Sequence, residues 1–128
     1  MTKWARGIPA ITLFVEDLRT AKSFYDKVFD LPPKFEDEDS VVFDFGNLLV
    51  NLLRTEAVPE LIEPAKLAAP DTGARAQLTL EVEDVDAVVA TLRSRGVELL
   101  NGPMDRPWGI RTASFQDPAG HIWEIAAT

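Results

Sequence analysis

The sequence contains no cysteine in 128 residues, which excludes disulfides, thiolate catalysis and cysteine metal sites. Histidine is scarce as well, since His121 stands alone, and no Ser–His or Cys–His pair or phosphate-binding glycine-rich loop is recognisable. No stretch approaches about 18 consecutive apolar residues, and the N-terminal run lacks a small-residue cleavage pattern. We therefore expect a cytoplasmic protein with no membrane partner.

Basic residues are outnumbered, with 13 Lys and Arg against 21 Asp and Glu and a formal net charge of −8. A nucleic-acid partner requires a basic face, so this class of partner is not expected. The acidic balance suits either simple solubility or a cationic ligand. The apolar content of 46% and the charged content of 27% are typical of an ordinary globular protein.

One short stretch occurs twice. TLFVED at Thr12–Asp17 returns as TLEVED at Thr79–Asp84, and an apolar residue follows each copy. A repeat at so long a spacing indicates a duplicated structural unit.

The first copy predicts a strand followed by a helix. Residues 10–15 suit a strand covered on both faces, Asp17 suits a helix N-cap, and the next apolar residues recur at helical spacing. Leu31-Pro32-Pro33 ends the helix, and Phe35 can open a short strand. Two further strands, 41–45 and 48–53, are expected around the turn Gly46-Asn47.

The second copy predicts the same order of elements. Asp84 precedes an apolar helical stripe that ends at Gly96, a residue suited to the left-handed position after a helix. Strands are expected at 77–82, 97–100, 110–115 and 122–126, and a loop is expected at 101–107.

The chain thus divides into two βαβββ modules, residues 8–54 and 76–127. The linker, residues 55–75, is punctuated by prolines and is expected to hold at most one short helix, around Leu61–Leu67. The predicted fold class is α+β.

Three stretches support a family resemblance: LFVEDL at 13–18, AKSFYDKVF at 21–29 and DPAGHIWEI at 117–125. With the paired modules, they resemble the vicinal oxygen chelate superfamily, which includes glyoxalase I, fosfomycin-resistance enzymes, extradiol dioxygenases and bleomycin-resistance proteins. The stretch RPWGIRTASFQDPAGHIWEI, 106–125, is similar to the bleomycin-resistance-like branch. The resemblance implies mixed sheets that curl around a cavity, and homodimers whose cavities combine modules from two chains.

The resemblance also implies positions for a divalent metal. They fall on Ala10, Asn51, Gln77 and Glu124, whereas His121 falls in a turn. Alanine cannot ligate, and one carboxylate with two amides makes a weak set of oxygen ligands. No cofactor and no tightly bound metal are therefore expected, and weak binding of a divalent cation is left open.

Candidate ligand contacts follow from the same match and from exposed aromatic residues. Trp108 in its Pro-Trp-Gly turn is the first, because a loop tryptophan is not needed for a core. Glu124 is either an exposed strand glutamate or a cavity residue paired with Arg111 or a ligand, and it is the candidate catalytic base. The full set is Phe14, Phe43, Gln77, Thr79, Glu81, Trp108, Arg111 and Glu124.

Three functions remain open at this point. The first is a metal-free homodimeric protein that sequesters a hydrophobic or cationic aromatic small molecule, as bleomycin-resistance proteins do for their drug. The second is a divalent-metal-dependent lyase, isomerase or dioxygenase with a degenerate ligand set. The third is metal-free acid–base catalysis by Glu124.

Overall fold

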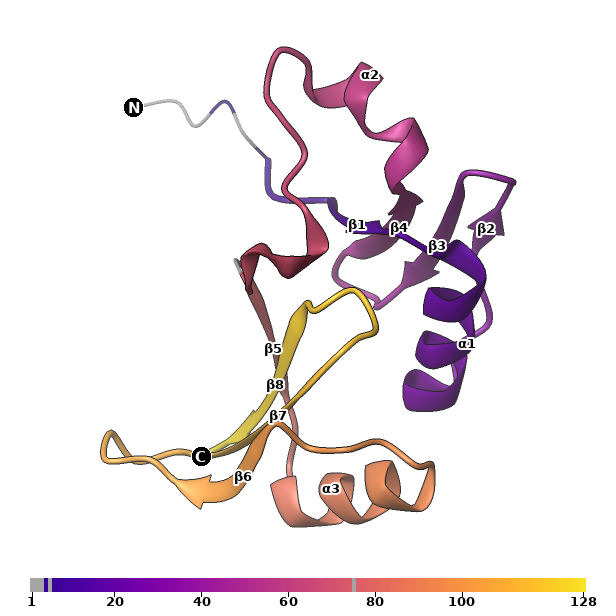
Figure 1. Ribbon diagram of the computed structural model, residues 1–128. Helices are drawn as coiled ribbons and strands as arrows, with labels where there is room; N and C mark the ends of the chain where they lie inside the picture. Colours follow the sequence, from indigo (N-terminus) through magenta and orange to yellow (C-terminus); the bar gives the residue numbers. More distant parts are fainter. Residues whose placement is uncertain (1–3, 5, 75) are drawn as a thin grey trace.

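Two β-sheets of four strands form the framework of the molecule (Figure 1). The computed structural model describes residues 4, 6–74 and 76–128. The first sheet consists of β1 (Ala10–Val15), β2 (Phe35–Glu36), β3 (Ser40–Asp44) and β4 (Leu49–Arg54). The second consists of β5 (Gln77–Glu81), β6 (Asn101–Asp105), β7 (Arg111–Gln116) and β8 (Ile122–Ala127).

Both sheets have the same topology. Their strand orders are β1-β4-β3-β2 and β5-β8-β7-β6. The pairs β1–β4 and β5–β8 are parallel, and all other neighbouring strands are antiparallel. The structure therefore confirms an α+β fold of two tandem βαβββ modules.

The repeated hexamer ends each time in the same helix cap. The Asp17 carboxylate accepts a hydrogen bond from the Thr20 amide at 3.0 Å and opens α1 (Leu18–Phe29). The Asp84 carboxylate accepts one from the Ala87 amide at 3.1 Å and opens α3 (Val85–Ser94). Each cap satisfies an amide that a helix start would leave unpaired, so the duplication preserves the chemistry of the cap.

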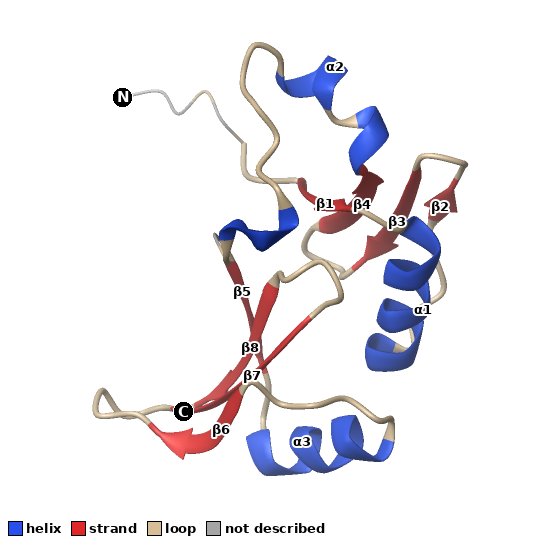
Figure 2. Ribbon diagram, in the orientation of Figure 1, coloured by secondary structure: helices blue, strands red, loops and turns tan. Residues whose placement is uncertain are grey.

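Helix α1 packs against residues of both modules (Figure 2). The Tyr25 ring lies 5.9 Å, centroid to centroid, from Phe43 of β3 and also from Trp123 of β8. Helix α1 covers β3 and β4 of the first sheet, and α3 covers β6, β7 and β8 of the second. The largest buried side chains are Tyr25, Phe43, Leu52, Phe115, Trp123 and Ile125.

The linker contains more regular structure than the sequence predicts. Its elements are the 3₁₀ turn η1 (Thr55–Ala57), the short helix α2 (Pro59–Ile62) and the 3₁₀ turn η2 (Pro70–Thr72). The helix expected around Leu61–Leu67 begins and ends earlier, because Pro59 suits a first helical turn and Glu63, before Pro64, is extended. The last linker residue, Arg75, lies outside the described residues.

The third strand of the second module is displaced from its predicted position. The sequence predicts a strand at 97–100 and a loop at 101–107, but the strand is β6, Asn101–Asp105. Gly102 and Pro103 are residue types that strands rarely contain, yet β6 lies at the edge of its sheet, where a proline is tolerated and a register shift interrupts the pairing. The 97–100 prediction is therefore wrong.

Among the described residues, no helix is long and apolar enough to cross a membrane.

Candidate functional site

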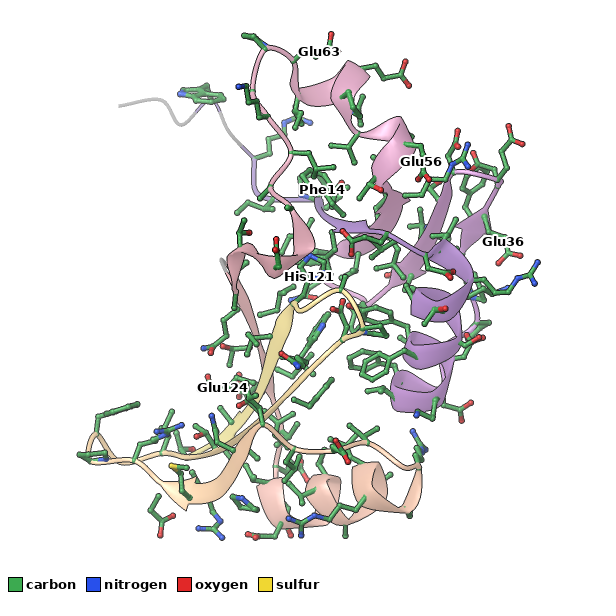
Figure 3. All side chains as sticks on the ribbon, in the orientation of Figure 1. Phe14, Glu36, Glu56, Glu63, His121 and Glu124 are labelled. Carbon is green, nitrogen blue, oxygen red and sulfur yellow. The ribbon has the colours of Figure 1, made fainter. Side chains whose placement is uncertain are left out.

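A row of polar side chains crosses the second sheet. Thr79 on β5 and Ser114 on β7 lie in register on either side of Glu124 on β8. The Thr79 hydroxyl donates a hydrogen bond to Glu124 Oε1 at 3.1 Å. Gln77 and Glu81 lie two residues to either side of Thr79 and share its face of β5. The structure thus gathers four predicted site residues on one sheet face, and Figure 3 shows Glu124 on the second sheet, well below His121.

A cavity of about 540 Å³ lies between this sheet and the first one. Most of its lining residues are apolar, and the polar ones are Asn47, Gln77, Thr79 and Glu81. Its volume falls within the range that small-molecule sites in proteins occupy. The lining residues are Ile11, Phe45, Asn47, Leu48, Val50, Gln77, Leu78, Thr79, Leu80, Glu81 and Trp123.

A second polar group is buried where the two modules meet. The Asp117 carboxylate, in a residue only 2% exposed, accepts a hydrogen bond from the Tyr25 hydroxyl at 2.6 Å. It lies 2.8 Å from His121 Nδ1. The Tyr25 oxygen in turn accepts a hydrogen bond from Trp123 Nε1 at 3.0 Å. The network ties α1 of the first module to the β7–β8 turn of the second.

Opposing effects set the pKa of Asp117. Burial raises the pKa of this carboxyl, but hydrogen bonds from His121 and Tyr25 outweigh it and leave the pKa below its ordinary value. Burial and the nearby Asp117 charge together raise the pKa of Tyr25, so the hydroxyl stays protonated. Asp117 is consequently an anion that only accepts hydrogen bonds.

The family assignment rests on the greater part of the chain. The model of the Glyoxalase/Bleomycin resistance protein/Dioxygenase superfamily matches residues 7–125. The chain belongs to this superfamily. The uncharacterized protein YraH of Bacillus subtilis is 32% identical over 119 residues, 90% of this chain and 93% of that protein. Metallothiol transferase FosB of Bacillus licheniformis is 26% identical, over 93% of this chain and 73% of the relative.

Solved structures of superfamily members have the same fold. A glyoxalase/bleomycin resistance protein/dioxygenase from Nocardioides superposes with a TM-score of 0.88 at 24% identity, covering 98% of this chain and 85% of its own. Lactoylglutathione lyase from Agrobacterium tumefaciens gives a TM-score of 0.77 at 20% identity, covering 96% and 94%. At these identities the likeness establishes the fold and leaves the activity open.

The four positions that the resemblance assigns to metal ligands hold a poor set of donors in this chain. Ala10 has no donor atom, and Asn51 and Gln77 offer amide oxygens only, so Glu124 is the single charged ligand. No cluster of three or more His, Cys, Asp or Glu residues suited to a metal occurs in the part of the chain that the structure describes. Asn51 Oδ1 is buried without a hydrogen-bond partner, but one neutral acceptor does not replace a missing anionic ligand. The residues present do not fit a tightly held divalent cation.

Arg111 is not the partner of Glu124, contrary to one expectation from the sequence. Its guanidinium pairs with Asp86 at 2.8 Å and with Asp105 at 3.1 Å. These hydrogen bonds raise the pKa of Arg111 and lower that of Asp86. The polar partner of Glu124 is Thr79, so the arginine acts in a separate surface cluster.

Two predicted aromatic contacts lie away from the polar row. Phe43 is 1% exposed and packs in the core against Tyr25, so in the single chain it presents almost no surface, and its contact with a ligand stays a prediction. Trp108 is 68% exposed in the β6–β7 turn, where the Arg106 guanidinium lies 5.9 Å from its ring centroid. Within one chain it borders none of the described cavities, so its contact with a ligand stays a prediction.

Phe14 and His121 border a different cavity, of about 370 Å³, beneath the linker. His121 lies in the predicted turn between β7 and β8, and no function is expected of it from the sequence. The four-residue spacing of Asp117 and His121 within one turn is a local signal for their pairing. The hydrogen bond from Tyr25, 92 residues away in sequence, has no such signal.

Proposed function

We propose that this protein binds and sequesters a hydrophobic or cationic aromatic small molecule without a tightly bound metal, as the bleomycin-resistance-like branch does. The observation that carries the proposal is the set of residues at the metal-ligand positions. Ala10 removes one ligand, and Glu124 alone contributes charge. A superfamily enzyme that activates oxygen atoms of its substrate on a cation needs more than this set provides.

The cavity beside β5 supports the proposed class of ligand. Ile11, Leu78 and Leu80 belong to its apolar lining, and Glu81 is the one charged residue among the described residues that border it. An aromatic cation can bury its rings against such walls while the carboxylate offsets its charge. The net charge of −8 adds a long-range attraction for a cation.

We expect the binding unit to be a homodimer. Gln77, Thr79 and Glu81 are exposed in the single chain, and a second copy facing them would enclose the polar row. Sedimentation velocity at micromolar concentration is expected to show a dimer. A monomer at that concentration would contradict the shared site and leave the metal question untouched.

Metal analysis of the purified protein tests the proposal directly. Elemental analysis is expected to find substoichiometric Ni, Zn, Mn and Fe, and added metal is expected to change the melting temperature little, because stabilisation follows site occupancy. Glu124→Gln and the exposed-surface control Glu98→Gln are expected to behave alike. Near-stoichiometric metal that Glu124→Gln removes and Glu98→Gln retains would instead support the second candidate.

The second candidate is a metal-dependent lyase, isomerase or dioxygenase. Glu124 and Gln77 lie on one face of neighbouring strands, and the relative FosB is named a metallothiol transferase.

A ligand-binding test addresses the first candidate. Calorimetric titration with acridine orange, a planar cation, is expected to show binding that Glu81→Gln weakens about ten-fold, or about 1.4 kcal/mol, and Glu98→Gln leaves unchanged. Equal binding by both variants would contradict the proposed role of Glu81.

A further inference from the structure

The cavity beneath the linker is a second site, open to solvent on one side and separate from the polar row. It lies between β1, the linker and the β7–β8 turn, and Figure 3 shows the labelled Phe14 and His121 beside the linker. Its volume is about 370 Å³. Neither Gln77 nor Glu124 borders it, so it does not depend on the proposed function. The lining residues are Thr12, Leu13, Phe14, Glu16, Lys66, Leu67, Ala68, Ala69, Thr72, Gly73, Ala76, Ala119 and His121.

Asp117 fixes the protonation pattern of the His121 ring. The carboxylate already accepts hydrogen bonds from Tyr25 and from the Ala119 and His121 amides, at 2.6, 3.0 and 2.8 Å. Because an ionised carboxylate can only accept, His121 Nδ1, 2.8 Å away, must carry the hydrogen. In the neutral ring, Nε2 is then a hydrogen-bond acceptor.

The hydrogen bond to Asp117 holds the His121 ring in one orientation, so the other ring nitrogen can act as a fixed hydrogen-bond acceptor. The Asp117 side chain is fully buried and the His121 side chain is 20% exposed, so the histidine spans the boundary between core and cavity. Asp117 occupies the Nδ1 side of the ring, and Nε2 has no protein hydrogen-bond partner among the described residues. The nitrogen that can meet a ligand in this cavity is therefore Nε2.

The other residues that line the cavity indicate which further chemical groups a ligand needs. Phe14, Leu67 and several alanines offer apolar surface, and Lys66 offers an ammonium donor. We propose that this cavity binds a small phenol, whose hydroxyl donates to His121 Nε2 and accepts from Lys66 while its ring lies against Phe14 and Leu67. A benzoate would bring a second anion near Glu16, and its carboxylate has no hydrogen to donate to Nε2. A benzylammonium ion would meet the charge of Lys66.

The single histidine makes the test direct. The 128-residue chain contains one histidine, so its proton NMR spectrum is expected to show one set of imidazole signals. The His121 Cε1 proton can therefore be followed while phenol is titrated to millimolar concentration. The signal is expected to shift saturably with phenol and not with benzylamine or benzoate. Lys66→Met is expected to weaken phenol binding several-fold, whereas Lys34→Met, beyond the cavity lining, is expected to leave it unchanged.

A matched pair of substitutions controls for the location. Ala69→Leu fills the cavity from the linker at an extended backbone position, and Ala65→Leu adds the same bulk to an exposed residue outside the lining. Ala69→Leu is expected to abolish the phenol-dependent shift, and Ala65→Leu to retain it. The proposal is overturned if phenol gives no saturable shift, if Ala69→Leu binds like the unsubstituted protein, or if benzylamine or benzoate binds as well as phenol. None of these outcomes bears on acridine orange binding at Glu81.

Discussion

The buried hydroxyl of Tyr25 provides the sharpest test of how the two modules are held together. Tyr25→Phe removes one oxygen and preserves the ring, which packs between Phe43 and Trp123. That oxygen donates to the Asp117 carboxylate at 2.6 Å and accepts from Trp123 Nε1 at 3.0 Å. Tyr25 is 0% exposed, so water does not replace either hydrogen bond without rearrangement.

The expected loss of stability follows from these two hydrogen bonds. A hydrogen bond to a charged group contributes about 1.5–3 kcal/mol, and a buried donor left unpaired costs about 1–3 kcal/mol. The two effects overlap, because both depend on one oxygen. We expect Tyr25→Phe to lower the free energy of unfolding by about 2–4 kcal/mol, a large effect for a single atom.

Equilibrium urea unfolding, followed by tryptophan fluorescence at a fixed protein concentration, measures this change. With a slope of about 2 kcal/mol per molar urea, the midpoint is expected to fall by roughly 1–2 M at unchanged slope. Ser94→Ala removes an exposed hydroxyl that bonds the Thr91 carbonyl and is expected to stay within about 0.5 kcal/mol. If Tyr25→Phe also stays within that limit, the network does not stabilise the fold as argued.

Three further predictions concern acid sensitivity, backbone space and metal affinity. The pKa of Asp117 is lower in the folded chain than in the unfolded one, so the ionised carboxylate stabilises the fold above about pH 4. This stabilisation is lost as the pH falls through the folded pKa. Urea midpoints measured from pH 6 to pH 2.5 should therefore drop less steeply for Asp117→Asn than for the unsubstituted protein. Gly102→Ala is expected to lower the free energy of unfolding by about 1–3 kcal/mol, because the added Cβ would lie 2.5 Å from the Thr112 carbonyl oxygen at a φ of +83°. Thermal unfolding followed by circular dichroism should show a lower melting temperature. An unchanged melting temperature would contradict that geometry. Ala10→His combined with Gln77→His is expected to create calorimetrically measurable Ni²⁺ affinity, and a folded double variant without it would show that these positions do not converge on one site.

The sequence by itself determined the elements that depend on neighbouring residues. A continuous apolar run in 10–15 and alternating apolar residues in 77–81 define strands, and Asp17 and Asp84 cap helices through amides only three residues away. Such features are local, so a single sequence reveals them. The internal repeat extended them to a duplicated fold, and the quoted motifs identified the superfamily before any contact was known.

Only the tertiary structure decided which polar and aromatic side chains meet. Arg111 pairs with Asp86 across 25 residues, and Tyr25 reaches Asp117 across 92. Side chains of β3 alternate between the two faces of the sheet, but only the packing of α1 decides that the face with Phe43 is the buried one. Likewise, Pro103 has no amide hydrogen to donate, and only the edge position of β6 makes that donor unnecessary in a strand. Each of these contacts joins residues that are distant in sequence and that folding brings together, so no pattern of neighbouring residues could reveal it.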